Sequence, residues 1–265
     1  MYVNPRCIAL VCASLTVVST LFSRSMATPS GYNPFKQAPP GASRSPCPAL
    51  NSLANHSYIP HDGRSIPFTQ LFNAIRTVYD LSLPLALLLT VTGFVLCGRF
   101  TGKWYSPRIS LDLHDLALHG RIEHDGSLGH ADVLPGEHYA PTVPDSERIT
   151  DMLDSGTVQL GPKGPEALSF TDLSRVRLRR DQSLIRPLDA VHSLITRGEV
   201  ALIVLLLGQG QLRYVPREYI RQFFSEERLP DGWHGPQQRI GLKELNSIGS
   251  SVKEEVNRLA ENEMN

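Results

Sequence analysis

Cysteine is scarce in this chain, with four residues among 265. Cys7 and Cys12 fall in an apolar N-terminal run, so only Cys47 and Cys97 stand in the rest of the sequence. Two cysteines cannot form the dense disulfide framework of small secreted proteins. Cys97 ends the apolar run LSLPLALLLTVTGFVLCG and is expected to behave as a small buried hydrophobic side chain. Cys47 stands between two prolines and needs another explanation.

An excess of charge of either sign is also absent, because Lys and Arg number 26 and Asp and Glu number 26. This balance does not indicate a nucleic-acid partner. The basic run RVRLRR has no interleaved aromatic residues and is interpreted as the solvated face of a helix. The sequence has no internal repeat and little strand-like alternation, which favours a mainly helical fold. Its length fits one domain.

The N-terminus carries an apolar run of about 16 residues, CIALVCASLTVVSTLF, behind a short basic start. Small residues follow at Ser25 and Ala27, so residues 1–27 are predicted to be a secretory signal peptide cleaved near Ala27. An uncleaved membrane anchor is the alternative, because the run is only slightly short for a span. Either form directs the chain to the secretory route, and no stable membrane span is expected in the mature chain.

Composition divides the remaining sequence into three parts. Residues 28–45 are rich in Pro, Gly and Ser and are predicted to be an extended lead-in. Residues 46–235 are predicted to be the functional domain. Within it, residues 126–165 are rich in Gly, Pro and His and are predicted to be a long surface loop. Residues 236–265 form a C-terminal extension that ends in a charged amphipathic helix or frayed tail without chemistry.

Helical periodicity recurs through the domain. A short helix is predicted after Pro48, and the segment IPFTQLFNAIRTVYD places its apolar residues on one stripe. Residues 81–98 are predicted to form a buried central helix, because they are short for a span and Pro84 interrupts them. Three later segments have helical patterns: LSFTDLSRVRLRRDQSL, PLDAVHSLITRGEVALIVLLLG and REYIRQFFSEERLP.

The first candidate for chemistry is Cys47. A thiolate just before a helix is stabilised by the positive end of the helix dipole and by free N–H groups of the first turn. Pro48 suits the first helical position, where the N–H would be unused, and Pro46 stiffens the approach. Such a sulfur could ligate a metal. The local pattern alone also fits a buried thiol in a turn.

Three histidines follow one another at intervals of five residues. On a helix His114, His119 and His124 would lie about 140° apart, so they could not face one zinc ion together. A zinc site is therefore excluded on this geometry.

An acidic group overlaps the last of these histidines. Glu123, His124 and Asp125, with Ser127 nearby, offer oxygen ligands for a hard cation and an imidazole that a carboxylate could orient. A solvated helix end would carry the same residues.

Glu199 is the third candidate, because it opens the apolar stretch EVALIVLLLG and its carboxyl is expected to be partly desolvated, which suits acid and base chemistry. A first-turn Glu that favours the helix dipole is the alternative.

These motifs together resemble the fungal haem-thiolate peroxidases, the chloroperoxidase family that includes the short unspecific peroxygenases. The resemblance covers roughly residues 40–235. It is carried, in order, by PCPALNSLANHSYIP, FNAIRTVYDLS, LALHGRIEHDGSL, GEVALIVLLLG and FFSEERLPDGW. It implies a single-domain, all-α fold around one haem b.

The resemblance also implies roles for the candidate residues. Cys47 would be the proximal haem iron ligand. Glu123, the backbone carbonyl of His124 and Ser127 would bind a magnesium or manganese ion beside a haem propionate. His124 and Asp125 would orient Glu199, the carboxylate that moves the proton of hydrogen peroxide.

The implied activity is a peroxidase or peroxygenase that uses hydrogen peroxide to form compound I and oxidises or oxygenates a small organic substrate, or a halide. A haem-binding or helical interaction protein with little turnover is the alternative on the same scaffold. A third possibility, a membrane-anchored helical protein without a cofactor, is based only on the two apolar runs.

Three positions depart from the pattern of the family. Ser57 stands where relatives commonly have Gly, His61 stands where an Arg often follows Ile-Pro, and Gly129-His130 stands where relatives commonly have Thr-Arg. Ser57 also creates a glycosylation sequon at Asn55, which is expected to be unused because this segment should pack close to the haem.

Overall fold

The computed structural model of the chain describes residues 31–103, 106–162 and 164–264. The predicted signal peptide, residues 1–27, lies outside the described residues. Most regular structure in the described part is helical, which confirms the mainly α fold class. The helices are α2 (Pro48–Asn55), α3 (Phe68–Tyr79), α4 (Leu83–Cys97), α5 (Ser146–Asp154), α6 (Phe170–Gln182), α7 (Ala190–Leu207), α8 (Arg217–Ile220) and α9 (Leu242–Met264).

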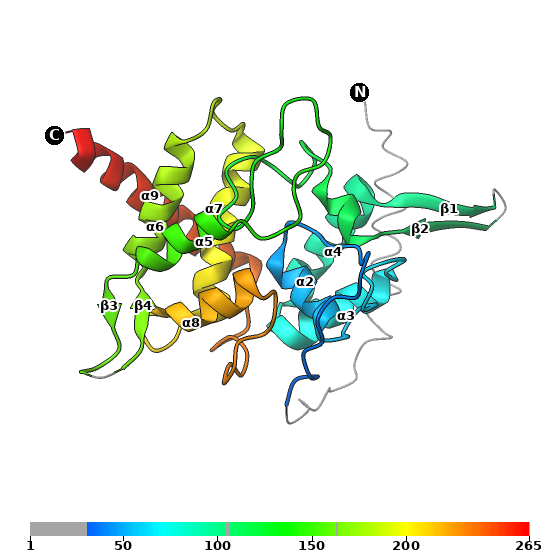
Figure 1. Cartoon of the computed structure of the whole chain (residues 1–265), viewed down its shortest axis with the longest axis horizontal. Helices are drawn as coiled ribbons and strands as arrows, with labels where there is room; N and C mark the ends of the chain where they lie inside the picture. The colour runs from blue at the N-terminus through cyan, green and yellow to red at the C-terminus, as the bar shows by residue number, and fades with distance from the viewer. Residues whose placement is uncertain (1–30, 104–105, 163, 265) are drawn as a thin grey trace. The chain divides into compact units, whose positions relative to one another are not determined.

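Short elements complete the fold. A 3-10 turn, η1, covers Leu113–Ala117, and a π-helical turn, η2, covers Arg221–Ser225 and continues from α8. Two small antiparallel sheets accompany the helices. The strands are β1 (Arg99–Lys103) and β2 (Ser106–Ser110) in one sheet, and β3 (Val158–Gln159), β4 (Glu166–Leu168) and β5 (Val215–Pro216) in the other. The hairpin of β1 and β2 extends away from α4 (Figure 1).

Helices α2 and α3 form as predicted. Pro48 occupies the first turn of α2 and Cys47 is its N-cap residue. The apolar stripe predicted for α3 is buried at four positions and partly buried at Phe68. These buried positions are Leu71, Phe72, Ile75 and Val78.

Helix α4 forms as predicted, but the prediction that it is buried is wrong for half of its surface. Leu85 and Phe94 face the core, whereas Leu88 and Val95 on the opposite side are exposed. The helix is apolar on all sides, so its sequence does not indicate which side packs. Its packing is against α3 and η1, and this covers one side only.

The prediction of a continuous loop over residues 126–165 is also wrong in part. Helix α5 and strand β3 lie within it. Asp145 caps α5 by accepting hydrogen bonds from the backbone N–H groups of Glu147 and Arg148, and Ile149 and Met152 are the buried residues of this helix. Three apolar positions on nine residues are a weak periodic signal within a segment rich in Gly and Pro.

The second half of the chain packs around α7. Helices α6 and α9 both lie against it, and Val252 and Leu259 are the buried residues of α9 (Figure 1). The predicted C-terminal helix is thus confirmed and is joined to the core. Helix α7 has the length and composition of a membrane span, but the core helix of a soluble protein has them too, and α7 carries Glu199.

Candidate active site

Cys47 lies where the sequence places it, at the start of α2. The backbone N–H groups of Leu50 and Ala49 donate to its sulfur. Cys47 is exposed to solvent, while desolvation of its sulfur by the surrounding protein raises the pKa of the thiol. The N–H donors act in the opposite direction to burial and favour the thiolate.

The loop before Cys47 is held by one buried amide. Asn51 Oδ1 accepts from the backbone N–H of Ser45 at 2.9 Å, and Asn51 Nδ2 donates to the Ser45 carbonyl at 2.7 Å. The N–H of Cys47 donates to Ser45 Oγ at 3.2 Å. The same amide nitrogen donates to Glu227, whose pKa burial raises to about 7. Sequence analysis missed Asn51 and Glu227 as supports of the thiol.

Glu199 projects from α7 toward two residues of the Glu-His-Asp loop. Ser127 Oγ donates to Glu199 Oε1 at 3.5 Å, and His124 Nε2 lies 4.0 Å from the same oxygen. Glu199 Oε2 is buried and has no hydrogen-bond partner. The side chain as a whole is 30% exposed, so the expected partial desolvation agrees with the structure. A carboxylate oxygen without a partner is free to accept a proton.

Two arginines of α6 contradict the prediction that RVRLRR is a solvated face. Arg177 and Arg180 are buried, because they share a helical stripe with Leu173 and Val176. Arg177 Nη1 donates to the Gly126 carbonyl and lies 4.0 Å from Glu199 Oε2. Helical spacing relative to the two apolar residues was the signal that could have identified these arginines.

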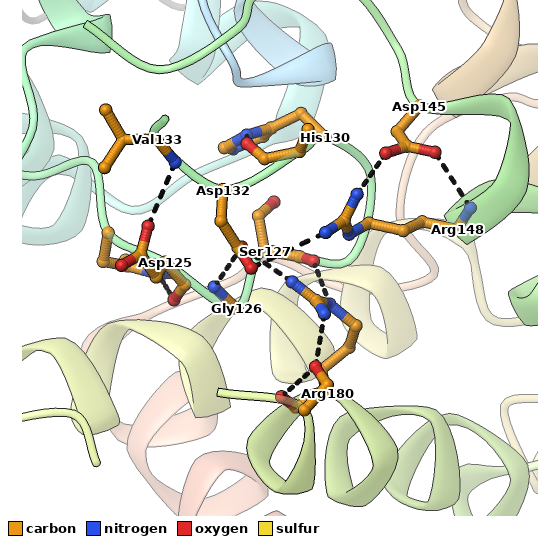
Figure 2. Close-up of polar contacts among 12 residues, drawn as sticks. Asp125, Gly126, Ser127, His130, Asp132, Val133, Asp145, Arg148 and Arg180 are labelled. Carbon is orange, nitrogen blue, oxygen red and sulfur yellow. Dashed lines mark hydrogen bonds and ion pairs between the residues drawn. The ribbon is translucent and has the colours of Figure 1, made fainter. Parts of the chain in front are cut away.

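Arg180 fastens the loop that carries the acidic motif (Figure 2). Its Nε donates to the Ser127 carbonyl at 3.0 Å and its Nη2 to Asp132 Oδ1 at 2.7 Å. The N–H of Gly126 donates to the same Asp132 oxygen at 2.8 Å. Arg148 lies 3.6 Å from the other oxygen of Asp132. Arg180 therefore binds the loop at the Ser127 carbonyl and at Asp132, and these contacts keep Ser127 next to Glu199.

Asp125 and His124 have separate tasks in this loop. Asp125 Oδ1 accepts from the N–H of Val133 at 3.1 Å (Figure 2), so its carboxylate braces the loop and does not contact Glu199. His124 Nδ1 lies 2.8 Å from the Asp125 carbonyl, which directs Nε2 toward Glu199. The ring of His192, which sequence analysis missed, has its centroid 5.9 Å from that of His124.

Glu123 is buried beside His119. Its Oε2 lies 2.7 Å from His119 Nδ1, while its Oε1 is buried without a hydrogen-bond partner. Burial raises the pKa of this carboxyl, and the contact with His119 lowers it. In the described residues no three His, Cys, Asp or Glu side chains gather as a metal cluster. A cation here would need the free oxygen of Glu123 together with backbone or hydroxyl oxygens.

The three histidines considered for zinc diverge for a different reason than the predicted one. Their segment, residues 114–124, is the turn η1 followed by loop, and not a continuous helix. His114 stacks on Tyr139 with ring centroids 4.9 Å apart, whereas His119 contacts Glu123 and His124 turns toward Glu199.

The structure gives a physical reason for the Gly129-His130 departure. A Cβ at Gly129 would lie 2.6 Å from Cδ1 of the buried Phe224. The larger residue of relatives therefore has no space here. His130 is buried beside it, and desolvation lowers its pKa. A small cavity beside Cys47 is lined by Pro46, Pro48, Gly129, His130, Thr142, Pro144, Phe224 and Glu227.

The other departures lie at the end of α2. Ser57 has φ of +57°, a conformation that suits the Gly of relatives. His61 Nδ1 lies 2.9 Å from the Ala54 carbonyl. The Asn55 amide is buried and donates to the Glu227 carbonyl, in agreement with the expectation that its sequon is unused.

The chain thus offers a thiol at a helix start with N–H donors to its sulfur, and an acid on α7 next to Ser127 and His124, which are groups that a haem-thiolate enzyme needs. Comparison with known proteins agrees. The family described as Peroxidase, family 2 matches residues 33–238. The chain therefore belongs to this family of haem-thiolate peroxidases and peroxygenases.

Individual relatives carry the same indication. The chain is 29% identical to a chloroperoxidase of Leptoxyphium fumago over 235 residues, which is 83% of this chain and 61% of that protein. It is 30% identical to an aromatic peroxygenase of Cyclocybe aegerita over 230 residues, which is 79% of this chain and 59% of that protein. The chain thus spans about three-fifths of the length of these curated relatives.

The family implies a haem, and the residues present fit one. Cys47 offers a sulfur with two N–H donors beside a cavity. Glu199 offers a buried oxygen without a hydrogen-bond partner on helix α7.

Proposed function

We propose that the protein is an enzyme that uses hydrogen peroxide to oxidise or oxygenate a small organic substrate, or a halide. The observation that carries this proposal is that the family match spans Cys47, the Glu-His-Asp loop and Glu199, and that the fold brings Ser127 and His124 of this loop to the Glu199 carboxylate. A haem held by Cys47 would supply a redox-active iron, and a thiolate ligand favours cleavage of the O–O bond of peroxide.

The chain's own residues would bind and move the proton. The free Oε2 of Glu199 accepts a proton from hydrogen peroxide and returns it to the oxygen that leaves as water. Ser127 donates to the other carboxylate oxygen, His124 Nε2 lies 4.0 Å from it, and Arg177 Nη1 lies 4.0 Å from the free oxygen. The N–H donors from the first turn of α2 would favour the thiolate form that an iron ligand requires, against the desolvation that raises the pKa of the thiol.

Two further assignments belong to the same proposal. A magnesium or manganese ion would bind the free Oε1 of Glu123, the His124 carbonyl and Ser127, because hard cations take oxygen ligands. The chain would enter the secretory route through residues 1–27, as the apolar N-terminal run predicts.

Replacing Glu199 by Gln tests the function. The variant should bind haem and keep the red-shifted Soret band that a thiolate ligand gives the reduced carbon monoxide adduct. Its turnover of hydrogen peroxide with an aromatic or halide probe should fall about 100-fold to 10,000-fold, the usual contribution of a general acid and base. Glu137→Gln, an exposed position, is the matched control and should retain full turnover.

Two outcomes would contradict the proposal. A purified, haem-loaded protein without the thiolate-type spectrum would show that Cys47 does not ligate the iron. A spectrum that persists with equal, low turnover in the wild type and Glu199→Gln would favour the haem-binding protein with little catalysis.

A further inference from the structure

Three aromatic rings from distant parts of the sequence lie in a row that begins beside the helix of Cys47. The ring centroids of Tyr79, on α3, and Trp233 are 6.1 Å apart, and Trp233 is stacked on Tyr32 with centroids 5.2 Å apart. Tyr79 and Trp233 are each 2% exposed, whereas Tyr32 is only partly buried. The row therefore runs from the core toward the surface. We call these three residues the aromatic triad.

The inner end of the aromatic triad is connected to the Cys47 sulfur through a single residue. Tyr79 donates its O–H to the Ala49 carbonyl at 2.7 Å, and its oxygen lies 2.6 Å from Ser52 Oγ. The backbone N–H of the same Ala49 donates to the Cys47 sulfur. Two hydrogen bonds and the backbone of Ala49 therefore join the phenol of Tyr79 to the thiol.

The composition of the aromatic triad distinguishes it from ordinary aromatic packing. Tyrosine and tryptophan rings can give one electron to a strong oxidant, whereas a phenylalanine ring cannot. The cluster between α3 and α4 consists of phenylalanines, with 6.3 Å between the centroids of Phe68 and Phe72 and 5.3 Å between those of Phe68 and Phe94. Both spacings in the aromatic triad lie within the range of packed rings, about 4.5–7 Å, so an electron can pass from ring to ring.

The polar groups of the aromatic triad determine where a proton could leave. Trp233 Nε1 donates to the Leu206 carbonyl at 2.8 Å, and the O–H of Tyr79 also donates to a carbonyl. A carbonyl is too weak a base to take either proton. Burial raises the pKa of Tyr32 to about 12, so this phenol is protonated at neutral pH. Tyr32 is the partly exposed member, and its oxidation can release the proton to water.

We propose that the aromatic triad carries single-electron oxidation from the Cys47 side of the core to Tyr32, where a phenol too large to enter the protein is oxidised at the surface. This inference rests on the proposed function, because the electron acceptor is a haem that hydrogen peroxide has oxidised. It adds a second place of reaction, separate from the groups around Glu199.

Each step moves one electron toward the haem. Trp233 gives up an electron across Tyr79 and keeps its N–H bonded to the Leu206 carbonyl. Tyr32 then gives one electron to Trp233 and releases its phenolic proton to water, which leaves a neutral tyrosyl radical. This radical takes a hydrogen atom from the phenol, which leaves as a phenoxyl radical. Two phenols supply two electrons and two protons, so one hydrogen peroxide becomes two molecules of water.

Rapid freeze-quench EPR of the haem-loaded full chain tests the proposal. After mixing with hydrogen peroxide in the absence of substrate, the wild type should give the signal of a tyrosyl radical. Tyr32→Phe keeps the stacked ring and removes only the hydroxyl, so it should fold as the wild type and lose the signal. Tyr219→Phe changes another partly buried tyrosine, outside the aromatic triad, and is the matched control that should keep the signal.

Two probes of different size separate the two places of reaction. They are free phenol and phenol linked to a dextran polymer, each supplied with hydrogen peroxide. The wild type should oxidise both, and Tyr32→Phe should lose only the turnover of the dextran-linked phenol. Trp233→Phe should behave as Tyr32→Phe in both experiments where its thermal unfolding shows that it folds. Tyr32→Phe decides the question if it does not.

The proposal would be overturned by a wild type that has the thiolate-type spectrum and oxidises free phenol, but gives no tyrosyl signal or leaves the dextran-linked phenol unoxidised. A Tyr32→Phe variant that keeps either the tyrosyl signal or the turnover of dextran-linked phenol would overturn it as well. The proposed function stands after each of these results. A protein without the thiolate-type spectrum and without peroxide turnover would instead contradict the proposed function, and this inference with it.

Discussion

Arg177 and Glu199 face one another between α6 and α7, with Arg177 Nη1 and Glu199 Oε2 4.0 Å apart. The oxygen has no hydrogen-bond partner and the arginine is fully buried. The arginine is held by the Gly126 carbonyl and by Asp181, at 2.8 Å from its Nη2. It therefore links the acidic loop to the helix that carries the proposed proton carrier.

Arg177→Met should weaken both the fold and the activity. The Gly126 carbonyl would lose its donor, and we expect the free energy of unfolding to fall by about 1 to 3 kcal/mol. Glu199 would lose its nearest positive charge, and we expect kcat/KM for hydrogen peroxide to fall at least about tenfold, which equals about 1.4 kcal/mol. Urea unfolding and peroxide kinetics of the haem-loaded protein measure the two effects.

Arg175→Met on the same helix is the control for Arg177. Arg175 is 40% exposed, and its buried partner Asp172 keeps the hydrogen bonds of Thr157 and Ser169 without it. Its variant should stay within about 0.5 kcal/mol of the wild type. Equal kinetics for both variants would mean that Arg177 does not act on Glu199.

Glu227 should make stability depend on pH. Burial raises its pKa from 4.5 to about 7, so the folded state retains a proton that the unfolded chain has lost between these values. The unfolded state then binds fewer protons, and the free energy of unfolding falls as pH rises from about 4.5 to about 7. Glu227→Gln cannot ionise and can still accept from Asn51. Its stability relative to the wild type should therefore rise across this window and level off above it.

Denaturant unfolding of the wild type and of Glu227→Gln over a pH series measures the difference between their free energies of unfolding. The contributions of the other carboxyl groups are the same in both proteins and cancel in this difference. Glu137→Gln, at an exposed position, should give a curve parallel to the wild type. A difference between Glu227→Gln and the wild type that is flat from about pH 4.5 to 7 would mean that the carboxyl is not desolvated in the folded protein.

Much of the fold could be predicted from local sequence. The buried face of α3 could be predicted from the spacing of its apolar residues, because one face of a packed helix must be apolar. The start of α2 could be predicted from Pro48, which suits the first turn of a helix. The exposure of α4 could not be predicted, because an all-apolar helix does not indicate which side packs. Helix α5 was missed although Asp145 is a good N-cap residue, because few apolar positions followed it.

The candidate site could be predicted only as separate parts. Cys47, His124 and Glu199 were chosen from motif and resemblance, and the structure brings His124 to Glu199. Arg177 was missed because a basic run is ordinarily solvated, and its burial depends on contacts with the Gly126 loop that no local pattern encodes. Glu227 was missed because its burial depends on α2, far away in the sequence.

Gly129→Ala should destabilise the protein by about 1 to 3 kcal/mol, the usual cost of overpacking. The added Cβ would lie 2.6 Å from Cδ1 of Phe224, a buried ring that would have to shift to make room. Thermal unfolding with and without Phe224→Leu forms a double-mutant cycle. The smaller side chain should reduce the cost of Gly129→Ala, and additive effects would contradict the contact.

Gly249→Ala is the control for this cycle. A Cβ at Gly249 would meet nothing within 4 Å, and the residue lies inside α9. Alanine favours a helix over glycine by about 1 kcal/mol, so this variant should be neutral or more stable. A loss of stability at Gly249 equal to that at Gly129 would remove the steric explanation.

Ser57→Gly should stabilise the protein. Ser57 has φ of +57°, which costs an L-residue roughly 1 to 2 kcal/mol and glycine very little. Glycine also adds entropy to the unfolded chain, so the net gain in the free energy of unfolding should be about 0.5 to 1 kcal/mol. Ser250→Gly, at an exposed position inside α9, should instead lose about 0.5 kcal/mol. Denaturant unfolding separates the two, and a loss of stability in both variants would mean that the backbone at Ser57 is not strained.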